Sequence, residues 1–106
     1  MDDLVRYKTM PVWNAETLPS AFQRMHNTQE GTWAQLKVLN GSLVFTFMTA
    51  EGLEIEPRTF TPSEPPPLIA PRQWHRIVSY SPDMECQLSF YCTPEAYAAK
   101  SLRLEP

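Results

Sequence analysis

The chain has 106 residues, of which 42% are apolar and 20% are charged, and its formal net charge is −3. This length is enough for one domain around one hydrophobic core. No run of lysine and arginine occurs, so we expect no binding to nucleic acid through its phosphates. The apolar stretches are too short to span a bilayer, and the opening MDDLVRYK lacks the apolar stretch of a signal peptide. We therefore expect a cytoplasmic protein without a membrane partner.

The first half of the chain predicts a hairpin. ETLPSAF, residues 16 to 22, is compatible with a short helical turn. In TWAQLKVLN, residues 32 to 40, apolar Ala34, Leu36 and Val38 share one face, as in a half-buried strand. Asn40 and Gly41 follow, which is a strong turn signal, and SLVFTFM, residues 42 to 48, alternates again. We expect these two strands to pair around the turn.

The second half predicts three more strands. LEIEPRTF, residues 53 to 60, contains Pro57, which favours an edge strand or a bulge. TPSEPPP, residues 61 to 67, is expected to be an extended connection. HRIVSY and ECQLSFYC then alternate. In the last strand, Cys86, Leu88, Phe90 and Cys92 share one face.

A single helix is expected at the end of the chain. Thr93 is a suitable N-cap, Pro94 suits the first helical position, and EAYAAKSL contains good helix formers. Many short strands joined by turns in about 100 residues are typical of a β-sandwich or barrel. We therefore expect an all-β fold with a short C-terminal helix, formed by a single domain over residues 1–106.

The two cysteines are expected to stay reduced. Cys86 and Cys92 lie six residues apart, or about 20 Å along an extended strand. A disulfide needs Cα atoms within about 7 Å, so these thiols cannot pair with each other without a sharp bend. They are more often inert core thiols than reactive groups, although a reactive thiol would suit oxyanion reduction.

Several motifs together resemble a known family. VLNGSL, residues 38 to 43, resembles a strand-turn-strand element of cupins, and IAPRQWHRI, residues 69 to 77, resembles the second cupin motif, in which a proline turn presents a histidine. MPVW, LP-x-x-F, HNT, GTW, WHR and FYC occur in the order found in the TehB/YeaR-like cupin family, which is linked by name to tellurite resistance. The likeness runs from about Leu4 to about Lys100 and corresponds to the N-terminal domain of long TehB proteins.

This resemblance implies a cupin-like double-stranded β-helix, or small jelly roll, with a divalent metal such as Zn, Mn, Fe or Ni inside the barrel. His75 matches the histidine of the second motif, and His26 is the other imidazole of the chain. The first cupin motif normally supplies two histidines and a glutamate, but the corresponding positions here are Asn27 to Gln29 and Ala34. Stable catalytic sites usually have about three protein ligands. The completions left open are Glu30, Glu85, Cys86, Tyr91 and Cys92.

His75 also has a simpler interpretation, as a half-buried side chain that bonds to backbone beside Trp74. If the second face of ECQLSFYC lines the barrel, then its polar side chains are pocket groups, and otherwise they are ordinary surface. The candidate pocket residues are Trp33, Trp74, Gln87, Ser89 and Tyr91.

Three functions remain open. The first is a cupin-type module that binds a small molecule, an oxyanion or a metal around His75 and His26 in tellurite resistance or oxidant stress. The second is a metal-dependent cupin enzyme of the dioxygenase or isomerase kind. The third is an interaction partner of a methyltransferase, since the chain has no room for a methyltransferase domain of its own. We expect a homodimer and no nucleotide cofactor, because three glycines make a nucleotide-cradling loop hard to build.

Overall fold

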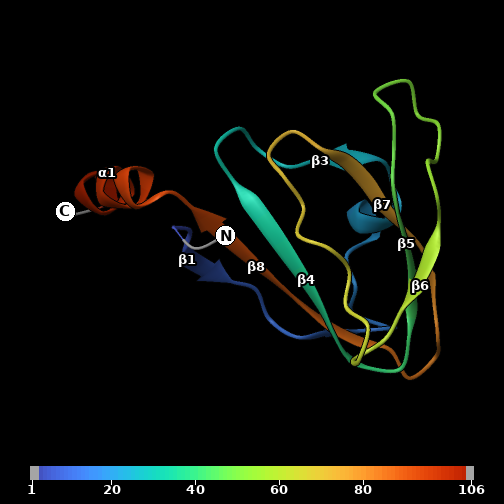
Figure 1. The fold of residues 1–106 in the computed structure, drawn as a ribbon. Helices are drawn as coiled ribbons and strands as arrows, with labels where there is room; N and C mark the ends of the chain where they lie inside the picture. The colour runs from blue at the N-terminus through green and yellow to red at the C-terminus, as the bar shows by residue number, and fades with distance from the viewer. Residues whose placement is uncertain (1–2, 105–106) are drawn as a thin grey trace.

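The computed structural model describes residues 3–104, without the side chains of residues 26 and 100–104. It contains two four-stranded antiparallel sheets and a C-terminal helix (Figure 1). The elements are β1 (Val5–Thr9), β2 (Trp13–Asn14), the 3-10 helix η1 (Ser20–Gln23), β3 (His26–Asn27), β4 (Trp33–Asn40), β5 (Leu43–Phe47), β6 (Arg58–Phe60), β7 (Trp74–Tyr80), β8 (Glu85–Cys92) and α1 (Pro94–Leu104).

The first sheet is built around β8. This strand pairs with β4 along one side, and with β1 and then β2 along the other. In the β4–β8 ladder, Ala34 lies opposite Phe90 and Leu36 lies opposite Leu88. Directly opposite residues of an antiparallel pair share a face of the sheet, so the apolar stripes of the two strands form one continuous surface.

The second sheet has the order β3-β7-β5-β6. Figure 1 shows it standing beside the β4–β8 pair, with η1 near β7. β6 pairs only with β5 in the described sheets, so it lies at an edge, as Pro57 led us to expect. The strand covers only residues 58–60 of the predicted 53–60 and begins after this proline. Phe45 and Ile77 of this sheet are buried and pack in the same core as Leu36 and Leu88 of the first.

The hairpin predicted around Asn40 and Gly41 is wrong. β4 and β5 follow one another in the chain but belong to different sheets. The turn between them is a corner that bonds to the β7–β8 turn: Asn40 donates to the Asp83 carbonyl at 2.9 Å, and the Ser81 hydroxyl accepts from the Ser42 N–H at 3.0 Å. An Asn-Gly pair reverses the chain, but it does not choose the partner of the strand that follows.

Other local expectations are confirmed. The observed strands β4, β7 and β8 cover the alternating segments, and Ala34, Leu36 and Val38 are buried as predicted. The helix α1 begins at Pro94, and the Thr93 hydroxyl accepts a hydrogen bond from the Ala96 N–H at 3.2 Å. The fold is therefore all-β with one short helix. No helix of the described chain is long and apolar enough to cross a membrane.

Candidate functional site

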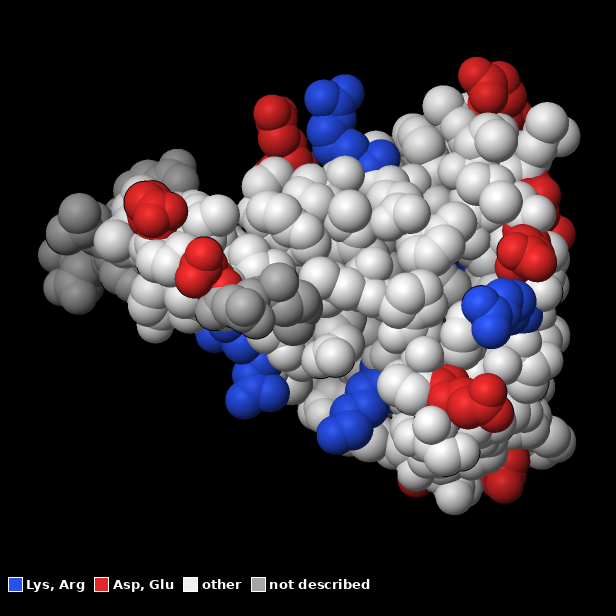
Figure 2. Space-filling view, viewed as in Figure 1, with Lys and Arg blue, Asp and Glu red and all other residues white. Residues whose placement is uncertain are grey.

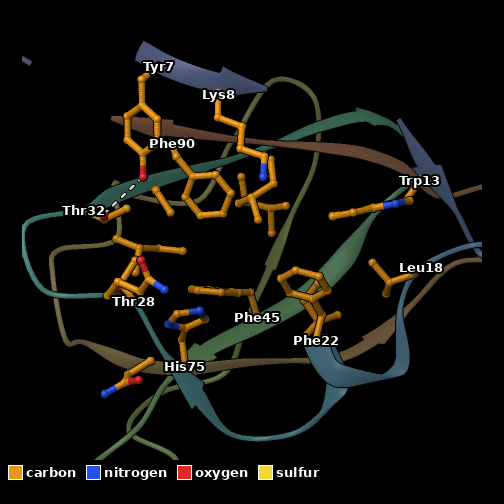
Figure 3. Close-up of a pocket in the computed structure, with 17 residues that line it drawn as sticks. Tyr7, Lys8, Trp13, Leu18, Phe22, Thr28, Thr32, Phe45, His75 and Phe90 are labelled. Atoms are coloured by element: carbon orange, nitrogen blue, oxygen red, sulfur yellow. Dashed lines mark hydrogen bonds between the residues drawn. The ribbon is translucent and has the colours of Figure 1, made fainter. Parts of the chain in front are cut away.

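A cavity of about 460 Å³ lies between the two sheets. Its lining comes from β1, β2, β4 and β8 of one sheet and from β3, β5 and β7 of the other (Figure 3). The helix η1 and the segments before η1, β4 and β7 contribute the remaining lining residues. Seventeen residues line it: Tyr7, Lys8, Trp13, Leu18, Phe22, Asn27, Thr28, Gln29, Thr32, Ala34, Leu36, Phe45, Ile69, His75, Ile77, Leu88 and Phe90. This volume is within the range of about 300–1,000 Å³ that small-molecule sites occupy.

His75 lines the cavity near the start of β7 and is only 6% exposed. Its Nδ1 lies 2.8 Å from the carbonyl oxygen of Gln73. Because a carbonyl only accepts, Nδ1 carries a proton. The ring lies 5.8 Å from that of Phe45. His75 is therefore held in one orientation.

The turn before β7 determines where His75 emerges. Gln73 closes this turn twice, by donating its N–H to the Ala70 carbonyl at 3.3 Å and by accepting the Ala70 N–H on its side-chain oxygen at 2.9 Å. Arg72 adopts a left-handed conformation, with φ of 62°, and donates its N–H to the Thr28 carbonyl at 2.9 Å. The turn is thus attached to the segment that carries Thr28.

Polar groups gather toward one end of the cavity and aromatic groups toward the other. Figure 3 shows Tyr7, Thr28, Thr32 and His75 at the polar end. There, the hydroxyls of Tyr7 and Thr32 lie 3.2 Å apart, and Thr28 donates its hydroxyl to the Ala70 carbonyl at 2.6 Å. These hydroxyls have partners inside the protein, so the polar end is formed without a ligand.

The apolar end is built by side chains from separate parts of the chain. The rings of Trp13 and Phe22 lie 5.1 Å apart, and Leu18 lies beside them in Figure 3. Phe45 and Phe90 lie between this end and the polar end. A ligand that lies along the cavity would therefore contact flat apolar side chains over most of the length of the ligand.

Of the expected site residues whose side chains the structure describes, only His75 lines this cavity. The backbone of His26 pairs directly with that of His75, but the side chain of His26 lies outside the described residues. Trp74 is half-buried and is not part of the lining.

The other four expected pocket residues lie on the opposite face of β4 and β8 from the cavity. Trp33 pairs with Tyr91, whose hydroxyl donates to Gln35 at 3.1 Å. Gln87 donates to the Met10 carbonyl at 3.0 Å, and the Ser89 hydroxyl lies 3.4 Å from that of Thr9. Since alternate residues of a strand point to opposite faces, the lining by Leu88 and Phe90 turns these polar groups away.

The candidate third metal ligands do not come together. Cys86 and Cys92 are free thiols with no exposed surface, whereas Glu30 and Glu85 are exposed. Burial raises the pKa of the Cys86 thiol to about 11, so this thiol is protonated at neutral pH and is not a ready ligand or nucleophile. Among the side chains that the structure describes, no three of His, Cys, Asp and Glu are grouped to hold a metal. These described residues do not fit a metal centre with three protein ligands.

Most residues of the lining were not predicted as site residues. Tyr7 and Lys8 lie in none of the quoted motifs, and Phe45 looked like an ordinary strand residue. Two signals were available. One is the set of family motifs, which contain the lining residues Trp13, Leu18, Phe22, Asn27, Thr28 and Thr32. The other is the stripe of Ala34 and Leu36 on one strand and Leu88 and Phe90 on the other. A stripe with small alanine beside larger side chains is compatible with an incompletely filled interior, but the same stripe is found in solid cores.

Comparisons with known proteins agree on the family. Residues 8–88 match the model of the TehB-like domain. Two Haemophilus influenzae proteins, each named as a probable S-adenosyl-L-methionine-dependent methyltransferase TehB, are 46% and 42% identical over 99 and 103 residues. These matches cover 93% and 97% of this chain but 35% and 36% of the relatives, so the chain spans about a third of their length.

Solved structures show the same relationship. The crystal structure of TehB from Haemophilus influenzae superimposes with a TM-score of 0.88 at 45% identity, over 93% of this chain and 35% of that one. A protein from Escherichia coli K12 has the same fold at 18% identity, with a TM-score of 0.79 over 89% of this chain and 95% of its own. With the family model matched over most of its length, the chain belongs to the TehB-like domain family.

Proposed function

We propose that this domain is a cupin-type β-barrel that binds a small organic molecule in the cavity beside His75. The observation that carries the proposal is the cavity of about 460 Å³ with aromatic walls and a few fixed polar groups at one end. Ligand sites are typically of this kind, since apolar walls supply binding energy and a few polar groups fix the orientation.

His75 is the polar group best placed to orient the ligand. Its hydrogen bond to Gln73 fixes the imidazole on the cavity wall, where the ring can bond to a polar group of the ligand. Phe45, against the imidazole, extends the wall on which a ligand ring would stack. The role proposed for the domain is recognition of a metabolite in tellurite or oxidant stress, as the family resemblance suggests.

A link to methyl transfer is a second part of this proposal. The curated relatives are named as probable methyltransferases and are about three times as long as the matched region. We propose that the TehB-like domain presents or senses a small molecule for such an enzyme. No methyltransferase chemistry is assigned to the 106 residues themselves.

The proposal is tested by filling the cavity. Ala34 lines the cavity from β4 and is 2% exposed. We expect Ala34→Leu to weaken binding of phenylacetamide at least about tenfold, because three added carbon atoms occupy ligand space. Binding is measured by the fluorescence of Trp13, in a background with Trp33→Phe and Trp74→Phe. Leu53→Ser is the matched control, since Leu53 is 68% exposed and lies outside the cavity.

Two results would contradict this function. One is equal binding by the Ala34→Leu variant and the starting protein, which would place the site elsewhere. The other is near-stoichiometric Zn, Mn, Fe or Ni in the purified protein that disappears in His75→Ala. That result would favour the metal site predicted on His26 and His75, whose backbones pair directly.

A further inference from the structure

The described residues of the cavity wall carry charge of one sign only. Among the described residues that line the cavity, Lys8 is the only lysine, arginine, aspartate or glutamate. The remaining polar lining consists of hydroxyl, amide and imidazole groups from Tyr7, Asn27, Thr28, Gln29, Thr32 and His75. None of the described lining residues is a carboxylate that could neutralise the lysine or repel an anion. The cavity, in a chain of net charge −3, therefore carries a local positive charge.

A β-bulge brings Lys8 to this wall. In the β1–β8 ladder, Arg6 pairs with Tyr91 and Lys8 pairs with Phe90, so two steps along β1 correspond to one step along β8. Tyr7 is the extra residue. Because a bulge interrupts the alternation of side chains, Tyr7 and Lys8 both line the cavity although they are neighbours in the chain. Without the bulge, one of the two would lie on the other face.

Lys8 can bind an anion with little loss of hydration. Lys8 is exposed, so its ammonium group keeps water around it and is not buried as a lone charge. Figure 3 shows its side chain extending from β1 toward the cavity, above the region between Phe90 and Trp13. The ammonium group of Lys8 is thus available to a bound anion beside the apolar side chains of Phe90 and Trp13.

We propose that the natural ligand is an organic anion with an aromatic or branched apolar body, whose carboxylate binds Lys8 while its body lies between Phe90, Phe45 and Trp13. This inference rests on the proposed function and specifies its ligand class. The apolar walls exclude a small inorganic oxyanion as the preferred ligand, because such an ion would lose its hydration and gain few hydrogen bonds there. The long side chain of Lys8 supplies an ion pair at the opening.

The test compares a charged probe with its neutral analogue. We expect phenylacetate to bind about two- to five-fold more tightly than phenylacetamide at low salt, as one exposed ion pair provides. Lys8→Gln should weaken the binding of phenylacetate more than that of phenylacetamide, so that the preference disappears. The preference should also fall as salt is added, since an exposed lysine is screened. Lys37→Gln is the matched control, because Lys37 is exposed on β4 and does not line the cavity.

The outcomes separate this inference from the proposed function. If both probes bind equally, or if Lys8→Gln leaves the preference intact, then the anion inference fails and the binding function stands. If tellurite binds more tightly than phenylacetate, then the ligand is an inorganic oxyanion and the inference also fails. If no probe binds, both the proposed function and the inference are overturned.

Discussion

The position of His75 depends on the residues just before it in the chain. The turn closed by Ala70 and Gln73 presents His75 to the cavity, and Arg72 takes the left-handed conformation within it. Residues with a Cβ rarely adopt this conformation, which costs about 1–2 kcal/mol. The hydrogen bond from the Arg72 N–H to Thr28 helps to maintain it. The turn therefore holds His75 at the cavity although the conformation of Arg72 is an unfavourable one for a residue with a Cβ.

This strain predicts a stabilising substitution. Arg72→Gly should raise the free energy of unfolding by about 0.5–1 kcal/mol, because relief of the left-handed strain exceeds the entropy that glycine adds to the unfolded chain. Urea denaturation measures the change. Arg24→Gly is the control: Arg24 has φ of −102°, so the same substitution should lower stability there. A loss of stability in Arg72→Gly would show that the turn depends on the arginine side chain.

The strands are divided between two sheets because turns pass the chain from one sheet to the other. The turn over residues 40 to 42 passes the chain from β4 in one sheet to β5 in the other. It contacts the β7–β8 turn through Ser81 and Asp83. Gly41 is required there for two reasons: its φ is 65°, and a Cβ would meet the Ser81 hydroxyl at 2.5 Å and an Asp83 carboxylate oxygen at 2.6 Å.

Gly41→Ala should therefore lower the free energy of unfolding by at least about 2 kcal/mol, from backbone strain together with steric overlap. Gly31→Ala is a close control, since Gly31 also has a positive φ, of 77°, but a Cβ there meets nothing within 4 Å. Its net cost should be about 0.5–1 kcal/mol, because the entropy that glycine adds to the unfolded chain offsets part of the backbone strain. Thermal or urea unfolding of the two variants measures the difference. Equal losses would mean that the corner yields to the added methyl group.

At the scale of the whole molecule, the hydrophobic core between the two sheets includes a titratable group. Cys86 has no exposed surface, and burial raises the pKa of its thiol to about 11 from an ordinary value of 9.0. The folded state therefore holds this proton more tightly than the unfolded state. The resulting stabilisation is fully present below pH 9 and is lost as the pH rises through 11.

We expect the free energy of unfolding to fall by about 2–3 kcal/mol over that pH range through Cys86. Cys86→Val removes the titrating thiol at similar volume, so its stability should decline less over the same range. Urea denaturation at several pH values measures both proteins. In the native protein at pH 8, Cys86 should also resist thiol reagents that label it after unfolding. Parallel pH profiles for the two proteins would contradict this account.

The sequence predicted the local elements well, because their signals are local. Alternation defined β4, β7 and β8, and Thr93 with Pro94 marked the start of α1. The resemblance around His75 also led to a residue of the cavity wall. Such features depend only on the conformational preferences of neighbouring residues, which can be read from the sequence.

The partners and faces of those elements were decided by the tertiary structure. Which of the two sheets β5 joins depends on how the turn at Gly41 packs against Ser81 and Asp83. These residues lie some forty positions further along the chain. The cavity face of β8 depends on its pairing with β4, and the bulge at Tyr7 exists only in the register of β1 against β8. Local alternation is equally compatible with either face. The sequence by itself thus determined the long alternating strands and the C-terminal helix. Long-range packing determined the short strands β1, β2 and β3, and the cavity with Lys8 and His75 on its wall.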